Sequence, residues 1–314
     1  MEKKLISVVI PVHNEENNIP LIYAELEKVL NTTNYDFEII FVNDGSTDNS
    51  PAELNKITAA DKTVKVIEFS RNFGKEAATT AGLDISQGAA CILIDADLQH
   101  PIKLIPEFLE KWEKGAEVVV GVRIKNKGEE LIKKIGSYLF YLTINTIAET
   151  KIIPHATDYR LLDRVVIEKF KELKEKNRMT RALIDWLGFK RDYLYFTANE
   201  RQYGKASYSY LKLMKLALSS YVAHSLLPLK LAGYLGIFIT FFSSILGLFM
   251  FADKIFLVEP YKMNFSGPAI LATSILFLVG IVLICLGLIA LYIGNIHAEV
   301  INRPIYIIKK KINF

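Results

Sequence analysis

The sequence predicts an α/β domain with a mainly parallel sheet covered by helices, followed by an interfacial helix and two transmembrane helices. Two observations support this prediction. In residues 1–200, apolar runs rich in β-branched residues alternate with charged, helix-like segments, which is typical of a parallel sheet covered on both faces. Further on, Leu231–Phe251 and Gly267–Ile293 contain no charged residue, and about 20 apolar residues suffice for a helix to cross a bilayer.

Five apolar runs are expected to form the strands: Leu5–Val12, Phe37–Val42, Val64–Phe69, Ala89–Ile94 and Glu117–Val122. The helices between the first four strands have recognisable starts, which are Asn18-Ile19-Pro20, Ser50-Pro51, and Gly74 before Lys75–Ser86. Ligands of such sheets bind beyond the carboxyl ends of the strands. We therefore expect the functional side chains at that edge.

The second half of the chain predicts a membrane anchor. Tyr208–Leu226 has apolar positions at helical spacing with lysines to one side, which indicates a helix lying in the membrane interface. Lys and Arg are more frequent outside the two spans than in the loop Ala252–Ser266 between them, and positive charge stays inside. This predicts a multi-pass plasma membrane protein with the N-terminal domain and both termini in the cytoplasm. The expected parts are residues 1–206 (cytoplasmic domain), 207–229 (interfacial region), 230–294 (two transmembrane helices, about 231–251 and 267–293) and 295–314 (a solvated cytoplasmic tail).

Other classes of protein are disfavoured. The net charge of +4 is small, and no basic stripe with interleaved aromatic residues indicates nucleic-acid binding. Cys91 and Cys285 form no disulfide or metal-binding pattern. The nucleotide fingerprints G-x-G-x-x-G and G-x-x-x-x-G-K-[ST] are absent.

Polar clusters end the predicted strands, and the most informative is I-D-A-D-L-Q-H-P at residues 94–101. Asp95 and Asp97 repel one another unless a cation lies between them, so the pair either faces water or binds a metal. Two carboxylates beside the amide oxygen of Gln99 suit Mg²⁺, which completes its shell with substrate phosphates and water. The sequence thus predicts a diphosphate bound through a metal.

The motifs, taken in order, resemble the family 2 glycosyltransferases with a GT-A fold. They are V-V-I-P-V-H-N-E-E, F-V-N-D-G-S-T-D, R-N-F-G-K-E-A-A, D-A-D-L-Q-H-P, V-G-V-R, T-D-Y-R-L-L-D-R, E-R-x-x-G and a late N-R-P-I-Y. With the paired C-terminal spans, they look closest to the membrane-anchored polyprenyl-phosphate glycosyltransferases: undecaprenyl-phosphate glucosyltransferases, the aminoarabinose transferase and dolichyl-phosphate mannose synthases. The resemblance covers almost the whole chain.

This resemblance implies roles for individual residues. The nucleoside pocket would be lined by Pro11, His13, Glu15, Val42 and Asp44. Mg²⁺ or Mn²⁺ would be held against the diphosphate by Asp95, Asp97 and Gln99, with Ala96 packing beside it.

Further cationic positions are implied for the phosphate groups. Arg123 and Arg201 would contact the phosphates of the donor or the acceptor. Where relatives read G-x-S-K-Y this chain reads G-K-A-S-Y, so Ser207 takes the usual lysine position and Lys205 is the candidate substitute.

The implied reaction is transfer of a sugar from a nucleotide-sugar donor to a polyprenyl phosphate, by a direct displacement that inverts the anomeric carbon. UDP-glucose is the first expectation; GDP-mannose, UDP-galactose and UDP-N-acetylglucosamine remain open. A phosphate monoester has a second pKa near 6, so the acceptor needs no base to become a nucleophile. Asp97, Arg123 and Asp158 are the expected catalytic residues: Arg123 positions phosphate, and Asp158 is the best candidate if a base is required. Asp158 and Arg160 either pair with each other or contact sugar.

Two rival functions are weighed beside this one. A processive polysaccharide synthase of the same fold usually carries Q-x-x-R-W, which Arg181–Trp186 does not match. An inactive membrane scaffold has no need for the aspartate pair. His100 is expected to be an ordinary loop residue, and a homo-oligomer is left open.

Overall fold

The computed structural model describes residues 3–124, 155–176, 178–197 and 267–314. The chain divides into two compact units, one made of residues 1–207 with 302–314 and the other of residues 208–301. In the second unit, the structure describes α10 (Gly267–Ile301). Within the described ranges, no helix combines the length and hydropathy needed to cross a membrane. The predicted interfacial helix and the first predicted span lie outside the described residues.

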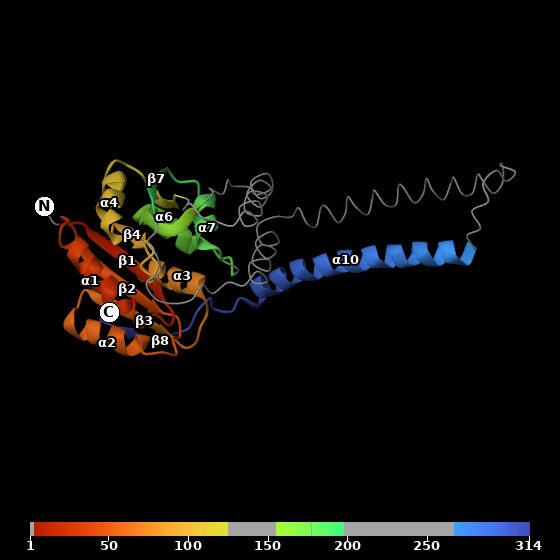
Figure 1. Cartoon of the computed structure of the whole chain (residues 1–314), viewed down its shortest axis with the longest axis horizontal. Coiled ribbons are helices and arrows are strands. Elements are labelled where there is room, and N and C mark those ends of the chain that lie inside the picture. The colour runs from red at the N-terminus through yellow and green to blue at the C-terminus, as the bar shows by residue number, and fades with distance from the viewer. Residues whose placement is uncertain (1–2, 125–154, 177, 198–266) are drawn as a thin grey trace. The chain divides into compact units, whose positions relative to one another are not determined.

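The first unit is an α/β domain (Figure 1). Its elements in chain order are β1 (Leu5–Val12), α1 (Ile19–Leu30), β2 (Asp36–Asn43), α2 (Ser50–Ala60), β3 (Val64–Phe69), α3 (Lys75–Ile85), β4 (Ala90–Leu93), a 3-10 turn (Ile102–Leu104), α4 (Ile105–Glu113), β5 (Val118–Arg123), β6 (Ala156–Asp163), α6 (Arg164–Glu172), α7 (Thr180–Trp186), β7 (Arg191–Phe196) and β8 (Ile308–Ile312).

The strands form one sheet in the order β7-β5-β6-β4-β1-β2-β3-β8. β1 pairs in parallel with β2 and β4, β2 with β3, and β5 with β7. β6 runs antiparallel to β4 and β5, and β8 runs antiparallel to β3. The prediction of a mainly parallel sheet is therefore confirmed, with two antiparallel strands added to it.

The five predicted strands correspond to β1–β5, with ends that differ by at most one residue. The helix starts at Ile19, Ser50 and Lys75 are also confirmed. β6 and β7 were not predicted. The last residues were predicted as a solvated tail within 295–314, and this was wrong for Ile308–Ile312, which form β8 in the sheet. Its three lysines are exposed while the isoleucines at either end are partly buried, as an edge strand requires.

Apolar side chains fill both faces of the sheet. Against one face, α1, α2 and α4 pack residues such as Ile22 and Phe108. Against the other face, α3, α6 and α7 pack residues such as Ala78 and Phe170. Each fully buried large aliphatic or aromatic side chain contributes about 1.5–3 kcal/mol, so both layers hold the strand ends in fixed positions.

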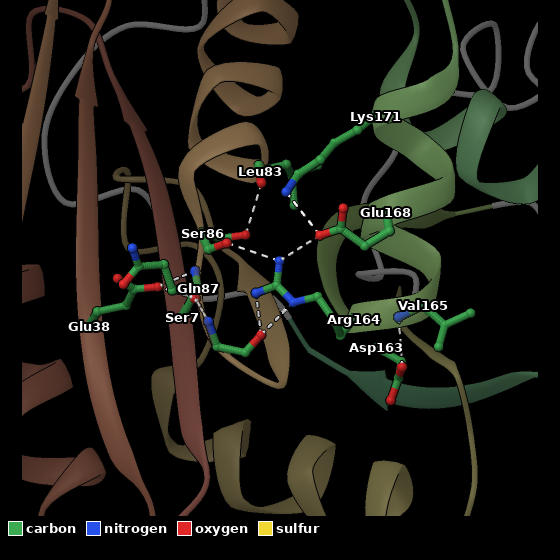
Figure 2. Close-up of polar contacts among 11 residues, drawn as sticks. Ser7, Glu38, Leu83, Ser86, Gln87, Asp163, Arg164, Val165, Glu168 and Lys171 are labelled. Atoms are coloured by element: carbon green, nitrogen blue, oxygen red, sulfur yellow. Dashed lines mark hydrogen bonds and ion pairs between the residues drawn. The ribbon is translucent and has the colours of Figure 1, made fainter.

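The turn between α3 and β4 is held by α6 (Figure 2). Arg164 donates hydrogen bonds to the carbonyls of Gly88 and Ser86, at 2.8 and 2.9 Å. The Gly88 N–H donates to the hydroxyl of Ser7 at 2.9 Å, and a Cβ at Gly88 would lie 2.5 Å from the Ser7 nitrogen, so a larger residue does not fit. These contacts fix the start of β4, whose far end leads to Asp95.

Candidate active site

The loops that follow β1, β2 and β3 meet at one edge of the sheet. His13 Nδ1 donates to the carbonyl of Asp44 at 2.9 Å, and Asn72 Nδ2 donates to His13 Nε2 at 3.1 Å. The prediction that the polar clusters converge at the carboxyl ends is confirmed for these three strands.

Asp44 anchors the loop between β3 and α3. Its buried carboxylate accepts hydrogen bonds from the N–H groups of Phe73 at 2.6 Å and Gly74 at 2.9 Å. Burial raises the pKa of Asp44 above its ordinary value, although these two N–H groups favour the charged form. Gly45 has a positive φ of 61°, and a Cβ there would lie 2.4 Å from the backbone of Arg71. Backbone crowding thus explains the glycine of the N-D-G-S motif.

The other residues predicted for the nucleoside pocket have different surroundings. Val42 is completely buried in the core, so its side chain packs against helices instead of lining a pocket. Glu15 accepts a hydrogen bond from the side chain of Asn18 at 2.5 Å, and its carbonyl accepts one from the Ile19 N–H, so it helps to begin α1. Pro11 lines a small pocket at the ends of β1 and β4.

Lys75, the first residue of α3, lies between two carboxylates of this pocket. Its Nζ is 2.6 Å from Asp95 Oδ1, beyond β4, and 2.7 Å from Asp158 Oδ2, on β6. The sequence analysis expected the aspartate pair to face water or to bind a metal. The structure shows a third arrangement for Asp95, which pairs with the ammonium group of Lys75. The alternative in which Asp158 and Arg160 pair with each other is wrong, because Arg160 pairs with Asp185 at 2.9 Å, while contact of Asp158 with a sugar stays a prediction.

The shared ammonium changes the charge states of the pocket. Burial by itself would raise the pKa of Asp158, but Lys75 outweighs it and lowers that pKa to about 2. Burial likewise would lower the pKa of Lys75, yet Asp95 and Asp158 raise it above its ordinary value. Glu76 also faces the pocket, and burial raises its pKa. Asp158 is therefore a stable anion at neutral pH and a weak base.

The pocket around this ion pair is bounded by charged and apolar side chains. Glu76 accepts a hydrogen bond from the Thr180 N–H at 2.8 Å, which joins the start of α3 to the start of α7. Arg181, the next residue of α7, lines the pocket and helps to lower the pKa of Asp158. Ile94 and Ile184 supply apolar walls. The lining combines carboxylates (Glu76, Asp95, Asp158) with cations (Lys75, Arg160, Arg181), so the pocket suits a polar ligand.

The loop after β4 presents the second aspartate of the motif. Asp97 Oδ1 accepts the Gln99 N–H at 3.2 Å, and Leu98 between them has a positive φ of 59°. Asp95, Asp97 and Gln99 are all partly exposed. The described residues contain no group of three or more His, Cys, Asp or Glu side chains that could hold a metal by themselves. The three side chains still fit Mg²⁺ or Mn²⁺, because such ions take one or two carboxylates and draw their other ligands from substrate phosphate and water.

Two neighbours of the aspartates are buried. Ala96 is 4 % exposed and belongs to the core. His100 was expected to be an ordinary loop residue, but it stacks on Tyr159 with ring centroids 5.1 Å apart. Its Nδ1 accepts the Asp95 N–H at 3.4 Å, and burial lowers the pKa of His100, so the neutral ring supports the backbone of Asp95.

The predicted phosphate-binding residues are only partly described. Arg123 is exposed at the carboxyl end of β5, and its N–H donates to the His155 carbonyl at 3.0 Å. It does not line the pocket around Lys75. Arg201, Lys205 and Ser207 lie outside the described residues.

Sequence reasoning missed Lys75, Glu76 and Arg181 as site residues. Lys75 was visible in the motif R-N-F-G-K, but its partners come from two other segments of the chain. Arg181 was considered only as part of a failed Q-x-x-R-W match. The available signal was the position of Lys75 at the start of the helix that follows β3 and the loop of residues 70–74.

The comparisons with known proteins agree with this architecture. Glycosyl transferase family 2 matches residues 7–170, which is more than half of the chain. This chain belongs to the family 2 glycosyltransferases. It is 41 % identical over 309 residues to an uncharacterized glycosyltransferase of Bacillus subtilis, covering 97 % of this chain and 93 % of the relative. It is 39 % identical over 305 residues to the SfII prophage-derived bactoprenol glucosyl transferase of Shigella flexneri, covering 97 % of each.

Among solved structures, this family 2 glycosyltransferase is similar to mannosyl-3-phosphoglycerate synthase from Rubrobacter xylanophilus. The TM-score is 0.51 at 19 % identity, and the match covers 70 % of this chain and 73 % of that one. At this identity the likeness shows the fold alone, a GT-A-like α/β domain.

Proposed function

We propose that this glycosyltransferase moves a sugar from a nucleotide-sugar donor to a polyprenyl phosphate at the cytoplasmic face of a membrane. The observation that carries the proposal is the similarity to bactoprenol glucosyl transferases along 97 % of the chain, well beyond the family 2 domain. The names of these relatives favour glucose as the sugar, and we take UDP-glucose as the first donor to test.

The edge formed by the loops after β1, β2 and β3 binds the nucleoside in this proposal. His13 is hydrogen-bonded to the carbonyl of Asp44 there, and the Asp44 carboxylate accepts hydrogen bonds from the N–H groups of Phe73 and Gly74. Asp95, Asp97 and Gln99 would hold Mg²⁺ or Mn²⁺ against the diphosphate. When bound, such a cation would neutralise the negative charge that develops on the leaving diphosphate.

The reaction centre lies in the pocket around Lys75. The acceptor phosphate is already a dianion at neutral pH and can attack without losing a proton. Asp158 is a weak base there, with its pKa lowered to about 2, so its role is to hold Lys75 in place. Lys75 and Arg181 supply positive charge to attract the two phosphate-bearing substrates. Attack from the face opposite the leaving group inverts the anomeric carbon.

A membrane anchor completes the proposal, because the acceptor is a lipid. Its support comes from the sequence: two long stretches without charge, and Lys and Arg concentrated on one side of them. The anchor would keep the site at the surface where the lipid phosphate resides.

The deciding experiment measures release of nucleoside diphosphate by the purified full chain, with a panel of sugar nucleotides. We expect release from UDP-glucose that depends on added undecaprenyl phosphate, with a product bearing one sugar. A product with many sugars would indicate a processive synthase. No release from any donor would refute the proposal and favour an inactive scaffold.

The metal is tested with a variant and a matched control. Asp97→Asn should lose nearly all transfer, and a chelator should do the same to the wild type. Asp192→Asn removes an aspartate that pairs with Lys111 at the opposite end of the sheet, and it should keep its activity. Undiminished turnover in excess chelator would contradict metal dependence.

A further inference from the structure

The motif N-R-P-I-Y near the end of the chain has no role in the proposed mechanism. The structure places its last residue, Tyr306, against β3 and α3, which flank a loop at the edge proposed to bind the nucleoside. Residues 302–314 belong to the first unit, although α10 precedes them in the chain. β8 pairs with β3, and the Ser70 N–H donates to the Ile307 carbonyl at 3.0 Å. The end of β3 is therefore covered by a segment that lies more than two hundred residues away in sequence.

Tyr306 of this segment contacts both β3 and α3. Its ring stacks on Phe69, the last residue of β3, with centroids 5.1 Å apart and planes 10° apart. Its hydroxyl donates to Asp84 Oδ2, on α3, at 2.7 Å. Burial and the neighbouring Asp84 raise the pKa of Tyr306, so the phenol keeps its proton and remains a donor. One side chain thus contacts both elements that flank residues 70–74.

Residues 70–74 form the loop that reaches the candidate donor site. Phe73 packs edge-on against Phe69, with centroids 5.7 Å apart and planes at 89°. The N–H groups of Phe73 and Gly74 donate to Asp44, and α3 then begins with Lys75. A contiguous set of contacts therefore runs from Tyr306 through Phe69 and Phe73 to Asp44.

We propose that Tyr306 is a positioning residue for donor binding, because it holds the β3–α3 loop against Asp44 from the far end of the chain. The donor-binding part of this inference rests on the proposed function, in which the loops after β1, β2 and β3 bind the nucleotide sugar. Loss of the ring would loosen Phe69 and Phe73, and the loop would leave Asp44 more often. Loss of the hydroxyl alone would keep the stacking and have a smaller effect.

The first measurement is hydrogen exchange of the full-length protein without substrate, followed at the Phe73 and Gly74 amides. Tyr306→Ala should speed their exchange by about tenfold, and Tyr306→Phe by about threefold, because opening becomes easier. Tyr35→Ala and Tyr35→Phe are the matched controls, since the Tyr35 hydroxyl also donates to a carboxylate, Glu113, at 2.8 Å. Tyr35 lies before β2, at the opposite end of the sheet, and its variants should leave the two amides unchanged.

The second measurement is donor affinity against turnover. Tyr306→Ala should raise the KM for the nucleotide sugar by about tenfold, while kcat changes by less than about threefold, since binding alone is impaired. Tyr306→Phe should restore most of the affinity. If Tyr306→Ala unfolds the protein, the comparison of amide exchange and KM between Tyr306→Phe and Tyr35→Phe still tests the role of Tyr306.

Several results would overturn the inference. One is unchanged hydrogen exchange at the Phe73 and Gly74 amides in the Tyr306 variants. Another is a rise in KM for a Tyr35 variant that equals the rise for the corresponding Tyr306 variant when both lose the same thermal stability. If the wild type binds no sugar nucleotide, the proposed function and the donor role fail together. The exchange data would then still decide whether Tyr306 holds the loop.

Discussion

Replacing Lys75 by methionine removes an ammonium that pairs with both Asp95 and Asp158. The substitution keeps the length and the apolar stem of the side chain but deletes contacts of 2.6 and 2.7 Å. Asp95, in the loop after β4, and Asp158, on β6, then line the same pocket without a shared cation. We expect both a loss of stability and a severe loss of transfer.

The stability change follows from exposure and charge. Breaking a buried ion pair costs about 3–5 kcal/mol, whereas exposed pairs contribute about 0.2–1 kcal/mol. The Lys75 side chain is 43 % exposed and those of Asp95 and Asp158 are 27 % and 34 %, so an intermediate value applies. We expect the free energy of unfolding to fall by about 1–2 kcal/mol, or about 5 °C in Tm for a domain of this size.

The loss should depend on pH in a definite direction. Asp158 has a pKa of about 2 against an ordinary 3.8, so Lys75 stabilises the folded state above about pH 4. This contribution disappears as the pH falls through 2. The lowering is worth about 2.5 kcal/mol at about 1.4 kcal/mol for each pKa unit, and water screening at this partly exposed group reduces it to about 1 kcal/mol. The difference between wild type and Lys75→Met should be largest near pH 7 and shrink towards pH 3.

The assay is thermal or urea unfolding of the detergent-solubilised full chain at several pH values, with transfer measured in parallel. Lys111→Met is the matched control, because Lys111 also pairs with an aspartate, Asp192, at 2.9 Å, and that pair lies away from the pocket. It should lose less than about 0.5 kcal/mol and keep its activity. The reasoning is refuted if Lys75→Met loses no more than this control at pH 7, or if its deficit is the same at pH 3.

Three further predictions concern the same site and the anchor. Asp158→Asn should slow transfer but leave the shape of the pH–rate profile between pH 6 and 9 unchanged. Complete loss of transfer with intact donor and lipid binding would instead identify Asp158 as the base. Asp44→Asn should lower the free energy of unfolding by about 1–3 kcal/mol, because a buried N–H of the β3–α3 loop loses its acceptor; a urea midpoint equal to that of the wild type would contradict this. For topology, Val258→Cys should react with an impermeant reagent in intact cells and Lys56→Cys should not; the reverse labelling would refute the proposed orientation.

The framework of the sheet is readable from the amino-acid sequence. The runs that became β1–β5 are apolar because both faces of a parallel sheet are covered, and this property is visible without any partner. The same logic placed Asp44 and Asp95 at the carboxyl-terminal edge. It did not find β6, because Thr157-Asp158-Tyr159-Arg160 reads as a polar motif. Arg160 is buried there with Asp185 as an ion-pair partner and the carbonyls of Thr157 and Arg181 as further acceptors.

Which charged side chains pair with each other depends on the folded arrangement of distant segments. Lys75 begins α3, Asp95 lies in the loop after β4 and Asp158 lies on β6. β6 must therefore pair with β4 before one ammonium can pair with both carboxylates. The pattern I-K-K-K-I at residues 308–312 is equally compatible with a solvated tail and with an edge strand, since an edge exposes charged side chains in either case. Its position beside β3 depends on contacts between residues more than two hundred positions apart, and local patterns carry no information about such a distance.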